Sequence, residues 1–230
     1  MPLTWQLSTD WEWRDPAKVF RTALFILLAV CLTYAVTVGR CAQAQEPLGS
    51  VTELEGTAKL FRGKQEFNVV LKMPVVVRDR LQTMSKSHLT VTLRGGSQLI
   101  LAELSTMVID DLAADARSNT TISLMLGHLR AVVYPSPNFE VHTPNAIVGV
   151  RGTEFETAYI EGKPCPGFPT CLRYTEVGVY KGVVEVRNAA NPKASPVRVT
   201  QGYETTVPCE MAPSSAAPLG MSELGAPGYR

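Results

Sequence analysis

The polar residues best suited to chemistry in this sequence are an arginine and a glutamate in the segment Arg151-Gly152-Thr153-Glu154-Phe155. Arg151 offers a planar fork of N–H donors, which can bind a partner's carboxylate or tie its own turn to a neighbouring strand. As an internal clamp it would hold backbone carbonyls or a carboxylate such as Glu154 or Glu185. We favour the clamp, because a buried or half-buried arginine persists when it is paired.

The residues around this arginine predict a strand, a turn and a second strand. A proline after Thr143 pushes that threonine out of the helical region. A short apolar strand follows, and Gly152 can take a positive φ at which other residues are strained. The motif residues, which we expect to shape the fold more than to bind, are Thr143, Pro144, Arg151, Gly152, Thr153 and Phe155.

Patterns for catalysis or metal binding are weak elsewhere. His88, His128 and His142 are isolated, without a second ligand at helical or strand spacing. The acidic stretch 110–115 lacks the glycine and the terminal glutamate of a calcium loop. The sequence contains no G-x-S-x-G elbow and no phosphate-binding loop. We therefore expect no catalytic residue, no metal and no cofactor.

The N-terminal residues predict a secretory signal. A basic flank precedes the uncharged run Ala23–Val38, and an Ala42-Gln43-Ala44 site follows it. We expect residues 1–44 to be a signal peptide cleaved after Ala44. The alternative is an uncleaved anchor formed by residues 23–38, although a spanning helix needs about 20 apolar residues.

The charge of the remaining chain argues against one class of partner. Residues 1–44 hold four of the 22 basic and three of the 21 acidic residues, which leaves 18 of each. A chain with balanced charge and no basic run lacks the positively charged patch with which proteins bind nucleic acid. We expect a membrane contact only if residues 23–38 are retained.

Three cysteines follow the signal segment, and export would permit disulfides. Cys165 and Cys171 bracket a loop rich in proline and glycine, so we expect them to pair and Cys209 to stay free. A Cys171–Cys209 bond is the alternative, and three reduced thiols are a further one, since spacing alone does not establish pairing.

Apolar residues alternate with polar ones along most of the chain from 51 to 207, which is typical of strands with one buried face. This period predicts an all-β fold, with short strands in an irregular β-roll or solenoid-like sandwich. We expect one domain over residues 45–207 and a disordered tail over 208–230, where proline, serine, alanine and glycine predominate. The predicted core positions are Leu89, Val91, Leu93, Leu101, Ile122, Leu124, Val141, Ile147, Phe155, Val177 and Val186.

From about Val51 to Val186 the sequence resembles the FecR domain of bacterial envelope proteins. The segments that carry the resemblance are Val51–Ala58, Asp79–Leu101, Leu126–Arg130 and Thr143–Phe155. The resemblance implies an all-β domain outside the cytoplasmic membrane. In the best understood members, that domain relays the state of an outer-membrane siderophore receptor to a cytoplasmic sigma factor.

Those members carry a substantial cytoplasmic segment before their membrane helix, whereas about twenty residues precede the apolar run here. We therefore expect an exported, non-enzymatic FecR-like interaction module, periplasmic or secreted, with a protein or cell-wall partner. One alternative is a membrane-anchored signal transducer of the sigma-factor-regulator type. Another is an envelope hydrolase whose catalytic residues are scattered along the sequence.

Overall fold

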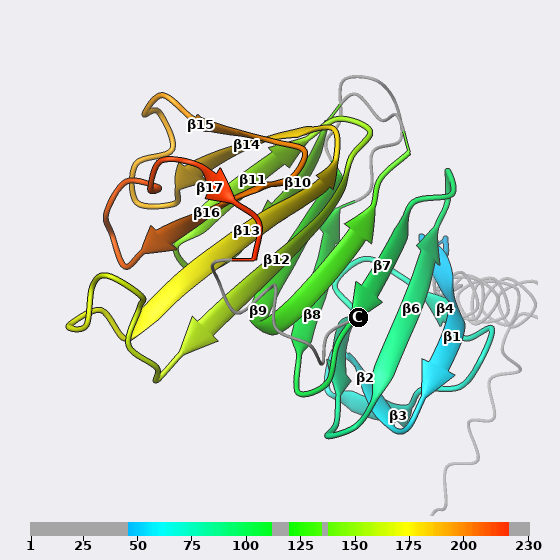
Figure 1. Ribbon diagram of the computed structural model, residues 1–230. Coiled ribbons are helices and arrows are strands. Elements are labelled where there is room, and N and C mark those ends of the chain that lie inside the picture. Colours follow the sequence, from blue (N-terminus) through cyan, green and yellow to red (C-terminus); the bar gives the residue numbers. More distant parts are fainter. Residues whose placement is uncertain (1–45, 112–119, 135–137, 221–230) are drawn as a thin grey trace, which may run out of the picture. The chain divides into compact units, whose positions relative to one another are not determined.

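Strands supply all the regular secondary structure in the parts of the chain that the structure describes. The computed structural model describes residues 46–111, 120–134 and 138–220. These ranges contain seventeen strands and no helix (Figure 1). In the same ranges, no helical segment is long and apolar enough to cross a membrane. The all-β prediction is confirmed.

The strands form two sheets that share one long strand, β9 (Thr120–Val132). Sheet A runs in the order β4 (Pro74–Val75), β1 (Gly49–Glu55), β6 (His88–Leu93), β7 (Gln98–Leu101), β9, β12 (Glu154–Glu161), β13 (Arg173–Lys181), β16 (Tyr203–Pro208) and β17 (Ala217–Pro218). Sheet B runs in the order β3 (Gln65–Asn68), β2 (Ala58–Arg62), β5 (Arg80–Thr83), β8 (Thr106–Asp111), β9, β10 (Phe139–His142), β11 (Ala146–Val150), β14 (Val183–Asn188) and β15 (Val197–Thr200).

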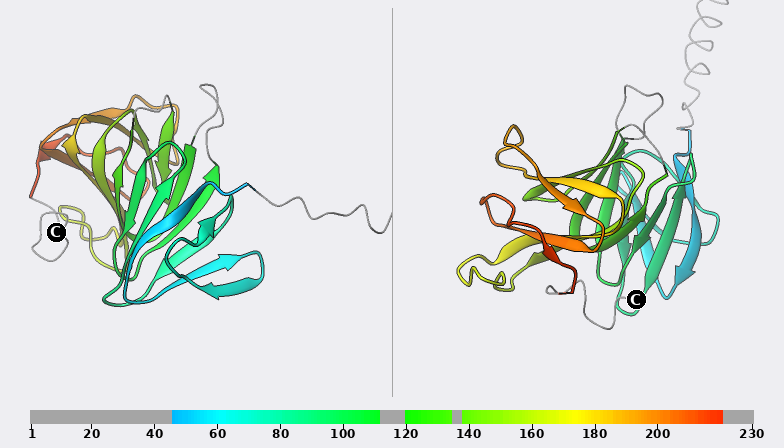
Figure 2. Two further views of the ribbon diagram at one scale, coloured as in Figure 1. Left: turned by 90° about the vertical axis from the view of Figure 1, so that its right-hand side faces the viewer. Right: turned by 45° about the horizontal axis from the view of Figure 1, so that its top comes forward.

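Strand β9 passes from one sheet to the other at Gly127. Its first half pairs with β8 and β10 in sheet B, and its second half pairs with β7 and β12 in sheet A. Gly127 has a φ of +88°, and a Cβ placed there would lie 2.7 Å from the Cα of Ser105. Glycine is therefore required on both counts. Strands β1–β8 lie on one side of β9 and strands β10–β17 on the other (Figure 2).

One apolar core lies between the two sheets and draws residues from nearly every strand. Ten of the eleven predicted core positions are buried in it, from Leu89 to Val186. Ile147 is the exception and is only half-buried. In β11 the inward residues are Ala146, Val148 and Val150, because the turn that precedes the strand shifts the alternation by one residue.

The ordered fold extends beyond the predicted boundary at residue 207. Ser214 accepts a hydrogen bond from the N–H of Thr206 at 3.0 Å, and β17 pairs with β16. Residues 208–220 are therefore part of the β structure, contrary to the predicted tail. The predicted signal segment 1–44 and residues 221–230 lie outside the described residues.

The disulfide joins Cys171 to Cys209, with a Cα–Cα distance of 5.9 Å. The predicted Cys165–Cys171 pairing is wrong, and Cys165 is a buried free thiol. The reason is the pairing of β13 with β16, in which the N–H of Cys209 donates to the carbonyl of Arg173 at 3.0 Å. This pairing places Cys209 beside Cys171, although the two residues are 38 positions apart in the sequence.

Candidate functional site

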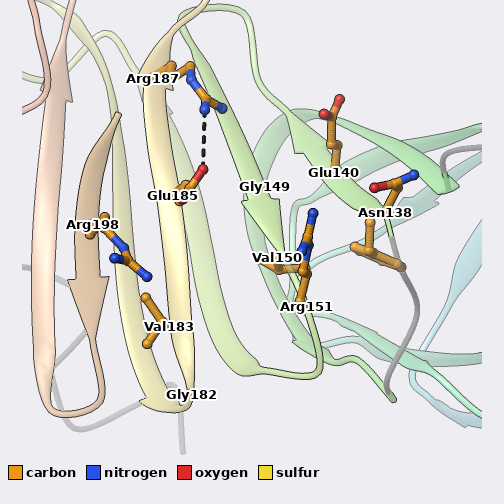
Figure 3. A pocket seen from close by; sticks show the side chains of 11 residues that line it. Asn138, Glu140, Gly149, Val150, Arg151, Gly182, Val183, Glu185, Arg187 and Arg198 are labelled. Carbon is orange, nitrogen blue, oxygen red and sulfur yellow. Dashed lines mark hydrogen bonds and ion pairs between the residues drawn. The ribbon is translucent and has the colours of Figure 1, made fainter. Parts of the chain in front are cut away.

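A pocket of about 550 Å³ opens on the outer face of sheet B, over β10, β11, β14 and β15 (Figure 3). Successive side chains of a strand point to opposite faces. The valines of β14 and β15 at 184, 186 and 199 are buried in the core. The residues between them therefore face outward and are polar or charged. We call this site the arginine pocket, after Arg151, Arg187 and Arg198.

Glycine forms the floor of the arginine pocket. Strand register places Gly149 between Glu140 on one side and Glu185 on the other, and Arg198 lies opposite Glu185. A Cβ at position 149 would meet only the carbonyl oxygen of Glu185, at 3.8 Å. The space above Gly149 is therefore wide enough to admit a methyl group.

Both carboxylates of the pocket already have side-chain partners. Arg187 Nη2 lies 3.2 Å from Glu185 Oε2, and His142 Nε2 lies 2.8 Å from Glu140 Oε2. These pairs are partly exposed, so each contributes little to stability. They engage the acidic side chains that would otherwise compete for the remaining arginines.

The side chains of Arg151 and Arg198 are exposed, and neither side chain makes a hydrogen bond or ion pair with any other residue that the structure describes. They lie on either side of β14, with the pocket between them (Figure 3). Three arginines and two glutamates leave the pocket with a net positive charge. The arrangement can hold an anionic group, and a guanidinium binds a carboxylate through two parallel hydrogen bonds.

The expectation that Arg151 is an internal clamp is wrong for this structure. Its two proposed carboxylate partners are engaged elsewhere, since Glu154 pairs with Arg130 and Glu185 pairs with Arg187. The turn is held by its other residues. Gly152 takes a φ of +63°, and the carbonyl of buried Thr153 accepts the N–H of Val133 at 2.8 Å.

Thr143 and Pro144 lie at the other end of β11 from Arg151. Thr143 is buried, and its hydroxyl accepts the N–H of Ala146 at 2.9 Å and lies 2.7 Å from the hydroxyl of Thr175. Pro144 is exposed beside it. The five residues of β11 span about 16 Å, so these two residues and Arg151 belong to separate places.

The remaining motif residue, Phe155, is fully buried in the core. The six motif residues therefore do not form one site, and Arg151 is the one that lines the pocket. Sequence reasoning missed Gly149, Arg187 and Arg198. The alternation of Glu185 and Arg187 with valines marks them as outward residues, but it does not show which strands lie next to each other.

A second polar cluster lies on sheet A and is closed to solvent. His128 Nδ1 lies 3.7 Å from Glu156 Oε1, and the hydroxyl of Tyr180 donates to Glu156 Oε2 at 2.8 Å. Both His128 and Glu156 are less than one-tenth exposed. Among the described residues, no three histidine, cysteine or acidic side chains are close enough to hold a metal ion.

Comparison with known proteins supports one family. The model of the FecR protein family matches residues 79–185. Two crystal structures of a candidate anti-sigma factor from Parabacteroides distasonis, at 1.65 and 2.50 Å resolution, are similar in fold, each with 20% identity and a TM-score of 0.48. Each match covers 60% of this chain and 59% of that protein's length. No curated protein is significantly similar to the chain.

The family match includes most of the arginine pocket but not all of it. Glu140, Gly149, Arg151 and Glu185 lie within the matched segment, and Arg187 and Arg198 lie beyond it. The resemblance that the sequence motifs indicated is confirmed. Residues 79–185 of this chain match the FecR family model.

Proposed function

We propose that the chain is an exported, non-enzymatic binding module of the bacterial cell envelope, and that its arginine pocket binds a carboxylate of a protein partner. The observation that carries the proposal is the pair Arg151 and Arg198, which face one pocket without a carboxylate partner among the described residues. The FecR domain supports an envelope role, since that family acts in signalling.

The chemistry of the pocket favours an acidic protein segment. A hydrogen bond from a guanidinium to a carboxylate contributes about 1.5–3 kcal/mol. The apolar part of the lining, Val150 and Val183, lies beside the charged groups, and Val183 is 37% exposed. A side chain carrying one carboxylate on a short apolar stem would contact both kinds of surface.

Site-specific photo-crosslinking in intact cells tests the location of binding. A photoreactive phenylalanine analogue replaces Val183 in the pocket, or Phe67 on β3 at the opposite end of sheet B. The two native side chains have the same exposed fraction, 37%, so the second position is a matched control. The proposal expects a discrete protein adduct from position 183 and none from 67. Equal adducts from both positions, or none from 183, would contradict it.

The FecR match supports a second proposal for the same pocket: the chain retains residues 23–38 as an anchor and relays binding across the membrane. The intact mass of the protein from envelope fractions separates the two. A mature chain that begins at Gln45 supports the exported module, and a full-length membrane-bound chain supports the transducer.

A further inference from the structure

Cys171 lies within bonding reach of two other cysteines. It is bonded to Cys209, at a Cα–Cα distance of 5.9 Å. Its carbonyl also accepts the N–H of Cys165 at 2.8 Å. With standard bond lengths, a hydrogen bond of this length keeps the two Cα atoms less than about 7 Å apart, which a disulfide can bridge.

The three cysteine side chains share one small apolar cluster, separate from the main core. Cys165 and Cys171 are buried in it with Ala158, Ile160 and Tyr174, and Cys209 packs against them. Water is largely excluded from this cluster, because Cys165 is only 2% exposed. The free thiol and the disulfide are therefore held together and away from outside thiols.

The backbone at Cys209 is strained in the bonded form. Its φ is +42°, a left-handed conformation that costs energy for a residue with a Cβ. The side-chain amides of Asn145 and Asn188 hold its carbonyl at 3.2 and 3.1 Å. Release of Cys209 from Cys171 would leave this residue held by these hydrogen bonds and by the one from its N–H to the carbonyl of Arg173.

We propose that Cys165 exchanges with the Cys171–Cys209 disulfide, so that the domain has two alternative disulfides. The Cys165 thiolate attacks Cys171 Sγ, a Cys165–Cys171 bond forms and the Cys171–Cys209 bond breaks. Cys209 leaves as a thiolate and takes up a proton, which replaces the one that Cys165 lost. The step consumes no oxidant or reductant, and it is independent of the function proposed for the arginine pocket.

The exchange replaces a disulfide between distant parts of the chain with one that closes a short loop. In the observed form, the disulfide fixes the residue after β16 to the residues before β13. In the exchanged form, it closes only the loop from 165 to 171, and residues 209–220 are held by hydrogen bonds alone. Burial, reinforced by the negative charge of Glu176, raises the pKa of the Cys165 thiol, which keeps it protonated and slows its attack on the disulfide at rest.

Thiol trapping on the full-length oxidised protein tests the exchange. Samples held at increasing urea concentrations below global unfolding are alkylated with N-ethylmaleimide, digested without reduction and mapped by mass spectrometry. The proposal expects the alkylated residue to change from Cys165 to Cys209, together with a Cys165–Cys171 linked peptide, at a rate independent of protein concentration. Alkylation of Cys165 alone at every concentration up to global unfolding would overturn it.

Two variants provide the controls. Cys165→Ser should keep the Cys171–Cys209 bond and give no alkylated Cys209 under the same conditions. Cys209→Ser should form the Cys165–Cys171 bond on air oxidation, because Cys171 then has a single partner. Two reactive thiols in folded Cys209→Ser would overturn the proposal. If Cys209→Ser does not fold, the trapping experiment on the unaltered protein tests the exchange by itself.

Discussion

The Arg62 guanidinium donates hydrogen bonds from two nitrogens to the fully buried carboxylate of Asp79. Nε lies 2.8 Å from Oδ1 and Nη2 lies 2.6 Å from Oδ2, while the side chain of Arg62 is 38% exposed and that of Asp79 is not exposed at all. Asp79 Oδ2 also accepts the N–H of Val76 at 2.9 Å. The hydrogen bonding to Asp79, together with its negative charge, raises the pKa of Arg62 above its ordinary value.

Arg62→Ala should destabilise the domain by about 3 kcal/mol or more, because it leaves a buried carboxylate without its counter-charge. The matched control is Lys59→Ala on the same strand, whose pair with Glu66 is exposed on both sides. That change should cost at most about 1 kcal/mol. Urea unfolding measures the free energy of unfolding of both variants. Equal losses would contradict the conclusion that Arg62 compensates a buried charge.

Leu124→Ala should lower the free energy of unfolding by about 2–5 kcal/mol, since this side chain is fully buried in the shared strand β9. The neighbouring residue supplies the control. Met125 points to the opposite face and is 49% exposed, so Met125→Ala should stay within about 0.5 kcal/mol. Similar losses in both variants would show that the register of β9 is wrong.

Two glycines near the pocket should respond differently to substitution. Gly152→Val should cost about 2 kcal/mol or more, because a φ of +63° is unfavourable for a β-branched residue. Gly149→Ala should leave the melting temperature nearly unchanged, because its Cβ meets nothing closer than 3.8 Å. Thermal melts distinguish the cases, and a large loss in Gly149→Ala would argue against an open pocket floor.

Stability should also fall at alkaline pH through Cys165. Burial raises the pKa of this thiol in the folded chain, whereas in the unfolded chain a cysteine ionises near pH 8.5. The stabilisation is therefore complete below about pH 8.5 and is lost as the pH rises above it, because the unfolded state ionises first. The melting temperature of the unaltered protein should fall more between pH 7.5 and pH 9.5 than that of Cys165→Ala. An equal fall in melting temperature for the two proteins would contradict this prediction.

The sequence predicted the fold class and most of the core, because alternation along a strand is a local property. It failed at Ile147, where both Asn145 and Ala146 are buried and the turn shifts the alternation by one residue. It also failed for residues 208–220, whose composition resembles a flexible tail but whose β16–β17 pairing depends on the rest of the sheet.

The arginine pocket and the disulfide share one reason for having been missed. Each depends on strands that are distant in sequence and adjacent in space: β11 with β14 and β15 for Arg151 and Arg198, and β13 with β16 for Cys171 and Cys209. Local patterns identify which residues of a strand face outward. They carry no information on which strands pair, so the partners of Arg151 and Cys171 could not be chosen correctly.

The double variant Arg151→Ala/Arg198→Ala, carrying the photoreactive residue at position 183, tests the central claim most directly. The two arginines are exposed and unpaired among the described residues, so the melting temperature should remain close to that of the parent. The adduct yield should fall at least tenfold, since each lost guanidinium–carboxylate hydrogen bond is worth about 1.5–3 kcal/mol and about 1.4 kcal/mol corresponds to a factor of ten in affinity. An unchanged yield, or a lower yield explained by a large fall in melting temperature, would contradict the account.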